Sequence, residues 1–147
     1  MSAPRHDDPR VARVIALFEQ LSPSDLDHLD RVYAPDTAFK DPFNEVRGIP
    51  AIRRIFNHMF DSLDEPRFVV REAIAQGDQA FLTWDFLFRM KRFSTQTQCI
   101  RGGTHLRFGT DGRVTLHRDY WDAAEELYEK LPLLGALMRW LKRRANR

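Results

Sequence analysis

The chain has little cysteine, no long apolar run and almost no net charge, and each shortage argues against a class of protein. Its single cysteine, Cys99, excludes a disulfide framework within the chain and fits a reducing compartment. No stretch approaches about 18 consecutive apolar residues, which argues against a membrane-spanning helix. The formal net charge is only +2, so the composition gives no reason to expect a nucleic acid partner.

The N-terminal segment also lacks the pattern of a secretory signal. Residues 1–10, MSAPRHDDPR, carry charges where a signal peptide needs an apolar segment. Together with the single cysteine, this predicts a cytoplasmic protein. The remaining composition, 43% hydrophobic and 30% charged, is that of one globular domain with a substantial core. We expect a single domain over residues 1–147, with a core from residue 10 to residue 122 and a helical tail from 123 to 147.

Hydrophobic periodicity predicts helices in the first half of the chain and strands in the second. Helical spacing of apolar residues occurs over residues 10–21, 26–33 and 49–63. Pro35 is expected to end the second helix, and a short strand is expected over residues 37–43. A period of two predicts antiparallel strands over residues 67–76, 79–93, 95–108 and 114–122. This order favours an α+β fold in which a curved, mostly antiparallel sheet wraps around N-terminal helices, with an extra C-terminal helix.

The last expected strand carries an unusual density of ionisable groups, HRDYWD. Alternation places His117, Asp119 and Trp121 on one face of the strand and the residues between them on the other. Asp122 has a structural explanation, since Glu125 follows it at the spacing of a helix capping box. Asp119 has no such explanation and is therefore a candidate for chemistry.

The long strand at 79–93 leaves two orientations open. Trp84, Phe86 and Phe88 share one face, and Thr83 and Asp85 share the opposite one. If Asp85 faces the helices, it lines an interior cavity, and the aromatic row needs a second subunit as its cover. If the aromatic row faces inward instead, Asp85 is an exposed acid on the outer face.

Two segments resemble the nuclear-transport-factor-2-like superfamily. They are YAPDTAFKDPFNEVRGIPAIRRIF, residues 33–56, and DGRVTLHRDYWD, residues 111–122, and the resemblance extends from about Val11 to Asp122. The superfamily includes ketosteroid isomerases, polyketide cyclases of the SnoaL type and limonene-1,2-epoxide hydrolases. The resemblance implies a cone-shaped α+β barrel with a deep pocket, commonly in a homodimer. Because its members include proteins that are not enzymes, the fold alone does not assign an activity.

The epoxide hydrolases resemble the chain most strongly at RDYWD, residues 118–122. Their two catalytic aspartates fall on Asp119 and Asp85. The arginine that bridges those aspartates falls on Thr83, and the tyrosine and asparagine that hold the attacking water fall on Phe39 and Asp41. Both carboxyl groups are therefore present, and the cation between them is not.

The ketosteroid isomerases resemble the chain at KDP, residues 40–42. Their general base falls on Asp41, whereas their tyrosine oxyanion donor falls near Leu17 and their aspartic acid donor falls on Thr104. The oxyanion hole is therefore largely missing, which argues against steroid isomerisation by that mechanism. The cyclases of the SnoaL type use an acid on the late strands as base, which implies Asp119.

The residues and the resemblance together define a candidate site. Its catalytic candidates are Asp119, Asp85, Asp41 and His117, and its ligand-binding candidates are Phe39, Thr83, Thr104, Leu106, Trp121 and Leu17. Burial and mutual proximity raise carboxyl pKa values, so such acids can form an acid/base pair. The hypothesis is that Asp119 acts as base and that Asp85 or His117 donates a proton. A metal bound by His117, Asp119 and Asp85 is a weaker alternative, and we expect no metal and no cofactor.

The C-terminal segment LPLLGALMRWLKRRANR, residues 131–147, combines an apolar face with a basic end. It either docks on the body or on a partner subunit, or it makes weak contact with an anionic membrane. The sequence as a whole predicts a homodimer, joined through the Trp84, Phe86 and Phe88 face, that binds a small apolar molecule. The protein is either an acid/base hydrolase or isomerase, or a non-catalytic carrier, sensor or dimeric adaptor of the same fold.

Overall fold

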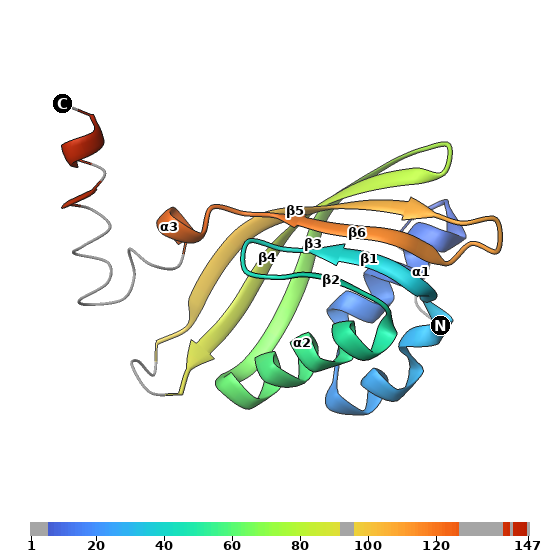
Figure 1. The fold of residues 1–147 in the computed structure, drawn as a ribbon, viewed down its shortest axis with the longest axis horizontal. Coiled ribbons are helices and arrows are strands. Elements are labelled where there is room, and N and C mark those ends of the chain that lie inside the picture. The colour runs from blue at the N-terminus through green and yellow to red at the C-terminus, as the bar shows by residue number, and fades with distance from the viewer. Residues whose placement is uncertain (1–5, 92–95, 127–139, 142, 147) are drawn as a thin grey trace.

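The computed structural model describes residues 6–91, 96–126, 140–141 and 143–146 (Figure 1). Most of the tail, with its alternatives of docking or membrane contact, lies outside these residues. The elements are α1 (Pro9–Glu19), a 3-10 helix η1 (Pro23–Arg31), β1 (Tyr33–Lys40), β2 (Glu45–Arg47), α2 (Ile49–Ser62), β3 (Leu63–Gln76), β4 (Gln79–Met90), β5 (Gln98–Phe108), β6 (Val114–Tyr120) and α3 (Ala123–Glu126). None of the described helices is both long enough and apolar enough to cross a membrane.

The six strands form one curved sheet in the order β2-β1-β6-β5-β4-β3. All neighbouring strands are antiparallel except β1 and β6, which are parallel. The helices α1, η1 and α2 lie against the concave side of the sheet (Figure 1). The predicted α+β class, with a curved sheet around N-terminal helices, is confirmed. The sheet stays open, with β2 and β3 as its edges, and does not close into a barrel.

Local sequence explains where the two α-helices begin and what they bury. Asp8 caps α1 by accepting a hydrogen bond from the backbone N–H of Arg10, and a proline occupies the first turn. Gly48 precedes α2 with a φ of 95°, a conformation that favours glycine. The apolar residues of each helix recur at helical spacing and face the sheet. The buried ones are Val11, Val14, Ile15, Phe18, Ile52 and Phe56.

The segment around Pro35 differs from the prediction. The second helix ends at Arg31, and Tyr33 begins strand β1 instead of ending a helix. Pro35 lies where the pairing of β1 with β6 shifts its register, between Tyr33 and Ala38. A residue without an N–H is tolerated there because the ladder is already interrupted. The short strand β2, which pairs with the end of β1, was not predicted either.

The long strand β4 points its aromatic row inward. Trp84 and Phe88 are each only 3% exposed, and both belong to the core. Asp85 lies on the opposite, outer face, where Arg71 donates to its Oδ2 from Nη2 at 2.6 Å and from Nε at 2.8 Å. The orientation with Asp85 in the cavity is therefore wrong. Burying two large rings is strongly favourable, and the acid finds a cation at the surface.

This orientation also changes the surface that could meet a second copy of the chain. Trp84, Phe86 and Phe88 cannot form an exposed dimer face, because they point toward the helices. The outer face of the sheet instead carries Phe81 and Tyr120, which are 40% and 46% exposed and whose ring centroids lie 6.5 Å apart. The homodimer itself stays a prediction.

Arg10 ties the start of α1 to the turn between β3 and β4. Its guanidinium donates to both carboxylate oxygens of Asp8, to Asp78 Oδ1 at 2.8 Å and to the carbonyl of Gly77 at 2.8 Å. It also lies over the ring of Phe108, 4.8 Å from the centroid. The hydrogen bond from Arg10 lowers the pKa of Asp8 from 3.8 to about 2.

We expect Asp8→Ala to lower the free energy of unfolding by about 1 kcal/mol at neutral pH, the usual effect of removing an N-cap. Because the folded-state pKa of Asp8 is depressed, its contribution is complete above the unfolded value of 3.8 and is lost as the pH falls toward about 2. Urea unfolding of both proteins at several pH values measures the difference. The exposed neighbour Asp7→Ala is the control, and a difference between wild type and Asp8→Ala that does not narrow in acid would contradict this account.

Candidate functional site

A cavity of about 330 Å³ lies between α2 and the inner face of the sheet. Its volume is in the range that accommodates small molecules. Its wall is predominantly aromatic, and the rings come from every layer around it. They are Phe39, Phe43, Phe56, Phe68, Trp84, Phe86, Phe88 and Trp121. Other apolar lining residues are Ile55, Met59, Leu63, Met90 and Ile100, and the polar ones are Asp41, His58, Ser62 and Asp119.

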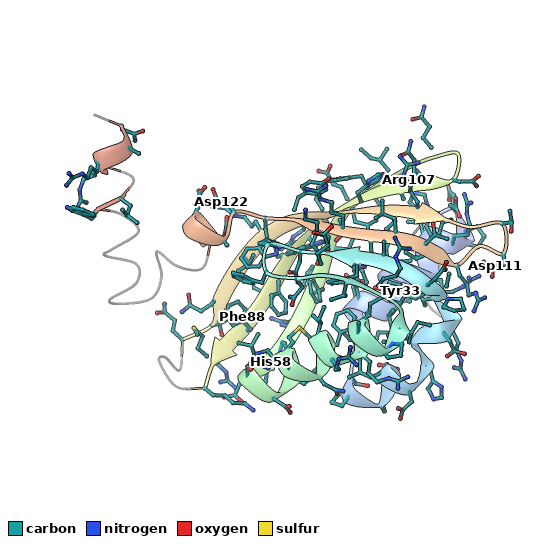
Figure 2. All side chains as sticks on the ribbon, viewed as in Figure 1. Tyr33, His58, Phe88, Arg107, Asp111 and Asp122 are labelled. Carbon is teal, nitrogen blue, oxygen red and sulfur yellow. The ribbon has the colours of Figure 1, made fainter. Side chains whose placement is uncertain are left out.

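The aromatic wall is held by ring-to-ring contacts between neighbouring strands. Phe68 from β3 stacks on Phe86 from β4 with centroids 4.5 Å apart, and its edge meets Trp84 at 5.3 Å. Phe86 stacks in turn on Phe88 at 5.2 Å. Such contacts fix ring orientation beyond what area burial alone provides. Figure 2 shows Phe88 and His58 close to each other and Tyr33 displaced from them along the long axis of the view.

A buried chain of hydrogen bonds ends at Asp119. Its Oδ1 accepts from the Thr104 hydroxyl at 2.6 Å and contacts His117 Nε2 at 2.7 Å. Behind Thr104, Trp84 Nε1 donates to the hydroxyl oxygen at 2.8 Å. Behind His117, the phenol oxygen of Tyr33 lies 2.8 Å from Nδ1. Thr104, His117 and Tyr33 are at most 2% exposed, whereas Asp119 reaches the cavity wall.

Trp84 and Tyr33, the two outer members of this series of hydrogen bonds, determine which atoms carry the hydrogens. The Trp84 indole can only donate, so the Thr104 hydroxyl hydrogen is directed to Asp119. Burial, reinforced by the charge of Asp119, raises the pKa of Tyr33 well above its usual value, so Tyr33 keeps its phenol hydrogen. That hydrogen needs an acceptor, which is Nδ1 of His117, so Nε2 carries the imidazole hydrogen and donates to Asp119. Two donors therefore converge on one carboxylate oxygen, each backed by a second group.

Asp41 lies at the cavity wall in the turn after β1. Its carboxylate accepts from the backbone N–H groups of Phe43 at 2.8 Å and Asn44 at 2.7 Å, and from the Asn44 side-chain amide. This arrangement is an Asx turn, in which an aspartate stabilises the backbone that follows it. Asp41 thus has a structural role in closing the turn between β1 and β2.

The structure brings some of the sequence candidates together and separates others. Asp119, Asp41, Phe39 and Trp121 line the cavity. His117 and Thr104 lie directly behind Asp119, as partners and not as lining residues.

The other candidates do not reach the cavity. Leu106 is fully buried in the core, and Leu17 packs against that core from α1, so neither borders the cavity. Thr83 and Asp85 lie on the outer face of β4, because their side chains alternate with the buried row. A metal site made by His117, Asp119 and Asp85 is thereby ruled out in this arrangement. Elsewhere in the described part of the chain, no group of three potential metal ligands is brought together.

Sequence reasoning missed Tyr33, Phe56 and Phe68. Tyr33 was assigned to a helix, and only the parallel pairing of β1 with β6 brings its hydroxyl to His117. Phe56 and Phe68 follow the predicted periodicity, but nothing in the sequence distinguishes a core ring from one that borders a cavity.

The chain resembles known proteins in both sequence and fold. A family model described as a SnoaL-like domain matches residues 14–117. No curated protein matches the chain.

Several solved structures share the fold. A hypothetical protein with a ketosteroid isomerase-like fold from Catenulispora acidiphila DSM 44928, solved in complex with trimethylamine, is 17% identical, with 83% of this chain and 92% of that chain covered and a TM-score of 0.70. An LEH-like epoxide hydrolase of M. tuberculosis is 19% identical, with 90% and 96% covered and a TM-score of 0.67. A proposed SnoaL-like polyketide cyclase from Jannaschia sp. CCS1 is 16% identical, with 85% and 93% covered and a TM-score of 0.69. At these identities the likeness shows the fold and not the activity.

We expect Thr104→Val to destabilise the protein by about 1–3 kcal/mol, because it leaves the buried Trp84 Nε1–H without an acceptor. The double variant Thr104→Val/Trp84→Phe should lose less free energy of unfolding than the sum of the losses in the two single variants, because the unpaired indole donor is then absent. Denaturant unfolding of the four proteins measures this coupling. Thr115→Val, an exposed change on β6, is the control. Strict additivity would show that the hydrogen bond makes no net contribution.

Proposed function

We propose that this chain, which belongs to the SnoaL-like domain family, is an acid/base enzyme that transfers a proton within a small apolar molecule. Asp119 is the base. The observation that carries the proposal is the placement of this carboxylate at the wall of an aromatic cavity, with Thr104 and His117 both donating to Oδ1. A positioned base in an apolar site is the arrangement that proton abstraction from carbon requires.

The geometry supports different roles for the two oxygens of Asp119: Oδ1 accepts hydrogen bonds from the protein, and Oδ2 is the base. Both hydrogen bonds that the described residues donate to this carboxylate end on Oδ1, which leaves Oδ2 to take a proton from a substrate C–H group. The proton taken up by the carboxyl group can return to a different carbon of the same molecule or exchange with solvent. The net result is an isomerisation or ring closure without a cofactor.

Proton transfer is favoured over epoxide hydrolysis. Hydrolysis by a carboxyl pair needs a second acid that is free to act beside the first. Asp85 is bound to Arg71 on the outer face, and the carboxylate of Asp41 is held by the amides of its own turn. The described lining of the cavity also includes no arginine that could bridge two carboxylates. Asp119 therefore works as a base without a paired acid.

A non-catalytic carrier or sensor of an apolar molecule is the second candidate. One observation favours it: the described lining includes no lysine, arginine or tyrosine that could stabilise a developing oxyanion. Besides Trp84, whose indole donates to Thr104, the lining groups other than carboxylates that can donate a hydrogen bond are His58 and Ser62 on α2 and the indole of Trp121. If none of these three stabilises the charge, the cavity binds without reacting.

A homodimer in which a second copy covers the outer face of the sheet also forms part of the proposal. Phe81, Tyr120 and Ile74 are exposed on that face, and Ile74 is 67% exposed. Covering large apolar side chains of this kind is a common reason for two copies to associate. The Asp119 cavity lies on the opposite side of the sheet, so each copy would keep its own site.

Deuterium exchange tests the proton-transfer proposal without knowledge of the natural substrate. Apolar enolisable ketones such as 2-tetralone are incubated with the protein in D₂O, and loss of the α-proton signal is followed by NMR. We expect the wild type to accelerate exchange and Asp119→Asn to lower the rate by about 10²–10⁴-fold.

Asp85→Asn is the matched control, because it removes an acid from the other face of the same sheet. It should leave the exchange rate unchanged. Equal rates for wild type and Asp119→Asn would refute the assignment of the base. Binding of the ketones without any exchange would favour the carrier.

A further inference from the structure

Among the described residues, neither carboxylate of the cavity is bound by a lysine or an arginine. Asp119 is held by the Thr104 hydroxyl and by the imidazole of His117, whose Nδ1 is occupied as the acceptor for Tyr33. Asp41 is held by backbone and side-chain amides. Carboxylates in apolar surroundings are costly unless a counter-charge is present. In this cavity no described lysine or arginine supplies that counter-charge.

The nearby cations are engaged elsewhere or lie outside the lining. Lys40, which precedes Asp41, has its Nζ 3.8 Å from Glu45 Oε2 on the neighbouring strand. Arg71 is bound to Asp85 on the outer face of the sheet. No lysine or arginine contributes to the described wall of the cavity. The described wall therefore carries two carboxylates and no lysine or arginine, which disfavours the binding of carboxylates and phosphates.

Each carboxylate is accompanied by an aromatic ring two residues further along the chain. Phe43 follows Asp41, and Trp121 follows Asp119, and all four side chains line the cavity. The rings of Phe43 and Trp121 meet edge to face, with centroids 5.5 Å apart and planes at 77°. Two perpendicular rings beside two carboxylates form a corner that suits a positively charged nitrogen, because ring faces attract cations most strongly when water is excluded.

The opposite end of the cavity is mostly apolar, and its polar members are His58 and Ser62 of α2. It is lined by α2 and the far ends of β3 and β4, through Ile55, Met59, Leu63, Phe88 and Met90. In Figure 2, Asp122, the residue after Trp121, lies apart from His58 and Phe88. The cavity thus extends from an acidic aromatic corner to an apolar end.

We propose that the cavity selects molecules that combine an apolar body with a cationic nitrogen, either a quaternary ammonium or a protonated amine. The nitrogen lies in the corner formed by Asp41, Phe43, Asp119 and Trp121, and the body extends toward α2. This inference rests on the proposed function in one respect: the ligand occupies the cavity in which Asp119 is the base. It does not require that a reaction takes place.

Binding of charged and uncharged isosteres tests the inference directly. The probes are benzyltrimethylammonium, its carbon isostere neopentylbenzene, and the anion 3-phenylpropanoate. Saturation-transfer NMR and tryptophan fluorescence report binding to the full chain. We expect the ammonium compound to bind at least ten times more tightly than the neutral isostere, which corresponds to about 1.4 kcal/mol. The anion should bind most weakly.

Matched variants identify the source of the preference. Asp119→Asn and Asp41→Asn should each reduce the preference for the ammonium compound severalfold, while Asp85→Asn leaves it unchanged. Trp121→Leu removes a ring without changing any charge. It should lower the affinity for the ammonium compound more than the affinity for neopentylbenzene. It also keeps the test decisive if a carboxylate variant does not fold, which circular dichroism shows.

The outcomes separate this inference from the proposed function. Equal affinities for the two isosteres, failure of the ammonium compound to bind at millimolar concentration, or an equal effect of Asp85→Asn would each overturn the inference. Asp119-dependent exchange of a neutral ketone together with any of these results would leave the proposed function standing. Selective ammonium binding without ketone exchange would support the inference and count against the enzyme.

Discussion

The parallel pairing of β1 with β6 is the constraint on which the site depends. Two strands that begin 81 positions apart in sequence, at Tyr33 and Val114, run side by side, with Phe39 opposite His117. Thr37 reinforces this pairing from the core, because its hydroxyl hydrogen-bonds carbonyl groups on both strands, those of Ala34 and Val114. Without the pairing of β1 with β6, the Tyr33 hydroxyl would not reach His117. The imidazole that donates to Asp119 would then lose its hydrogen bond from Tyr33. A long-range backbone contact therefore determines the geometry of one carboxylate.

Periodicity in the sequence was sufficient for the fold class and for the relative orientation of neighbouring side chains. It placed His117, Asp119 and Trp121 on one face of β6, and it separated Asp85 from the aromatic row of β4. It could not say which face of β4 was inside, because alternation is symmetric. The burial of Trp84 and Phe88 decides the matter, and Arg71 pairs with Asp85 on the outer face. Arg71 lies where the pairing of β3 with β4 shifts between Val70 and Glu72, and a single sequence does not reveal such an irregularity.

The same limit explains why the candidate site was only partly predicted. The resemblance to epoxide hydrolases placed a second catalytic acid on Asp85, and the strand orientation contradicts that transfer. Asp119 and its partner His117 were found, because an acid and a histidine at inward positions of one strand are visible in the sequence. The polar partners that complete the chain, Trp84 and Tyr33, come from strands that meet only in the folded sheet. A buried polar chain of this kind supports one arrangement of the core, since each member is satisfied only when all are in place.

The open sheet described above leaves β3, 14 residues long, as an edge strand among the described residues, where Glu19 of α1 accepts a hydrogen bond from the backbone N–H of Val70. An unpaired edge of that length can recruit a strand from another molecule and lead to aggregation. Here the edge is interrupted near its start, where the register shifts between Asp64 and Arg67, Glu65 adopts a φ of 50° and Pro66 offers no N–H. The second irregularity, at Arg71, bends the strand again and adds a bulky cation. A second copy of the chain therefore meets an interrupted row of backbone donors along β3, which opposes strand pairing at this edge.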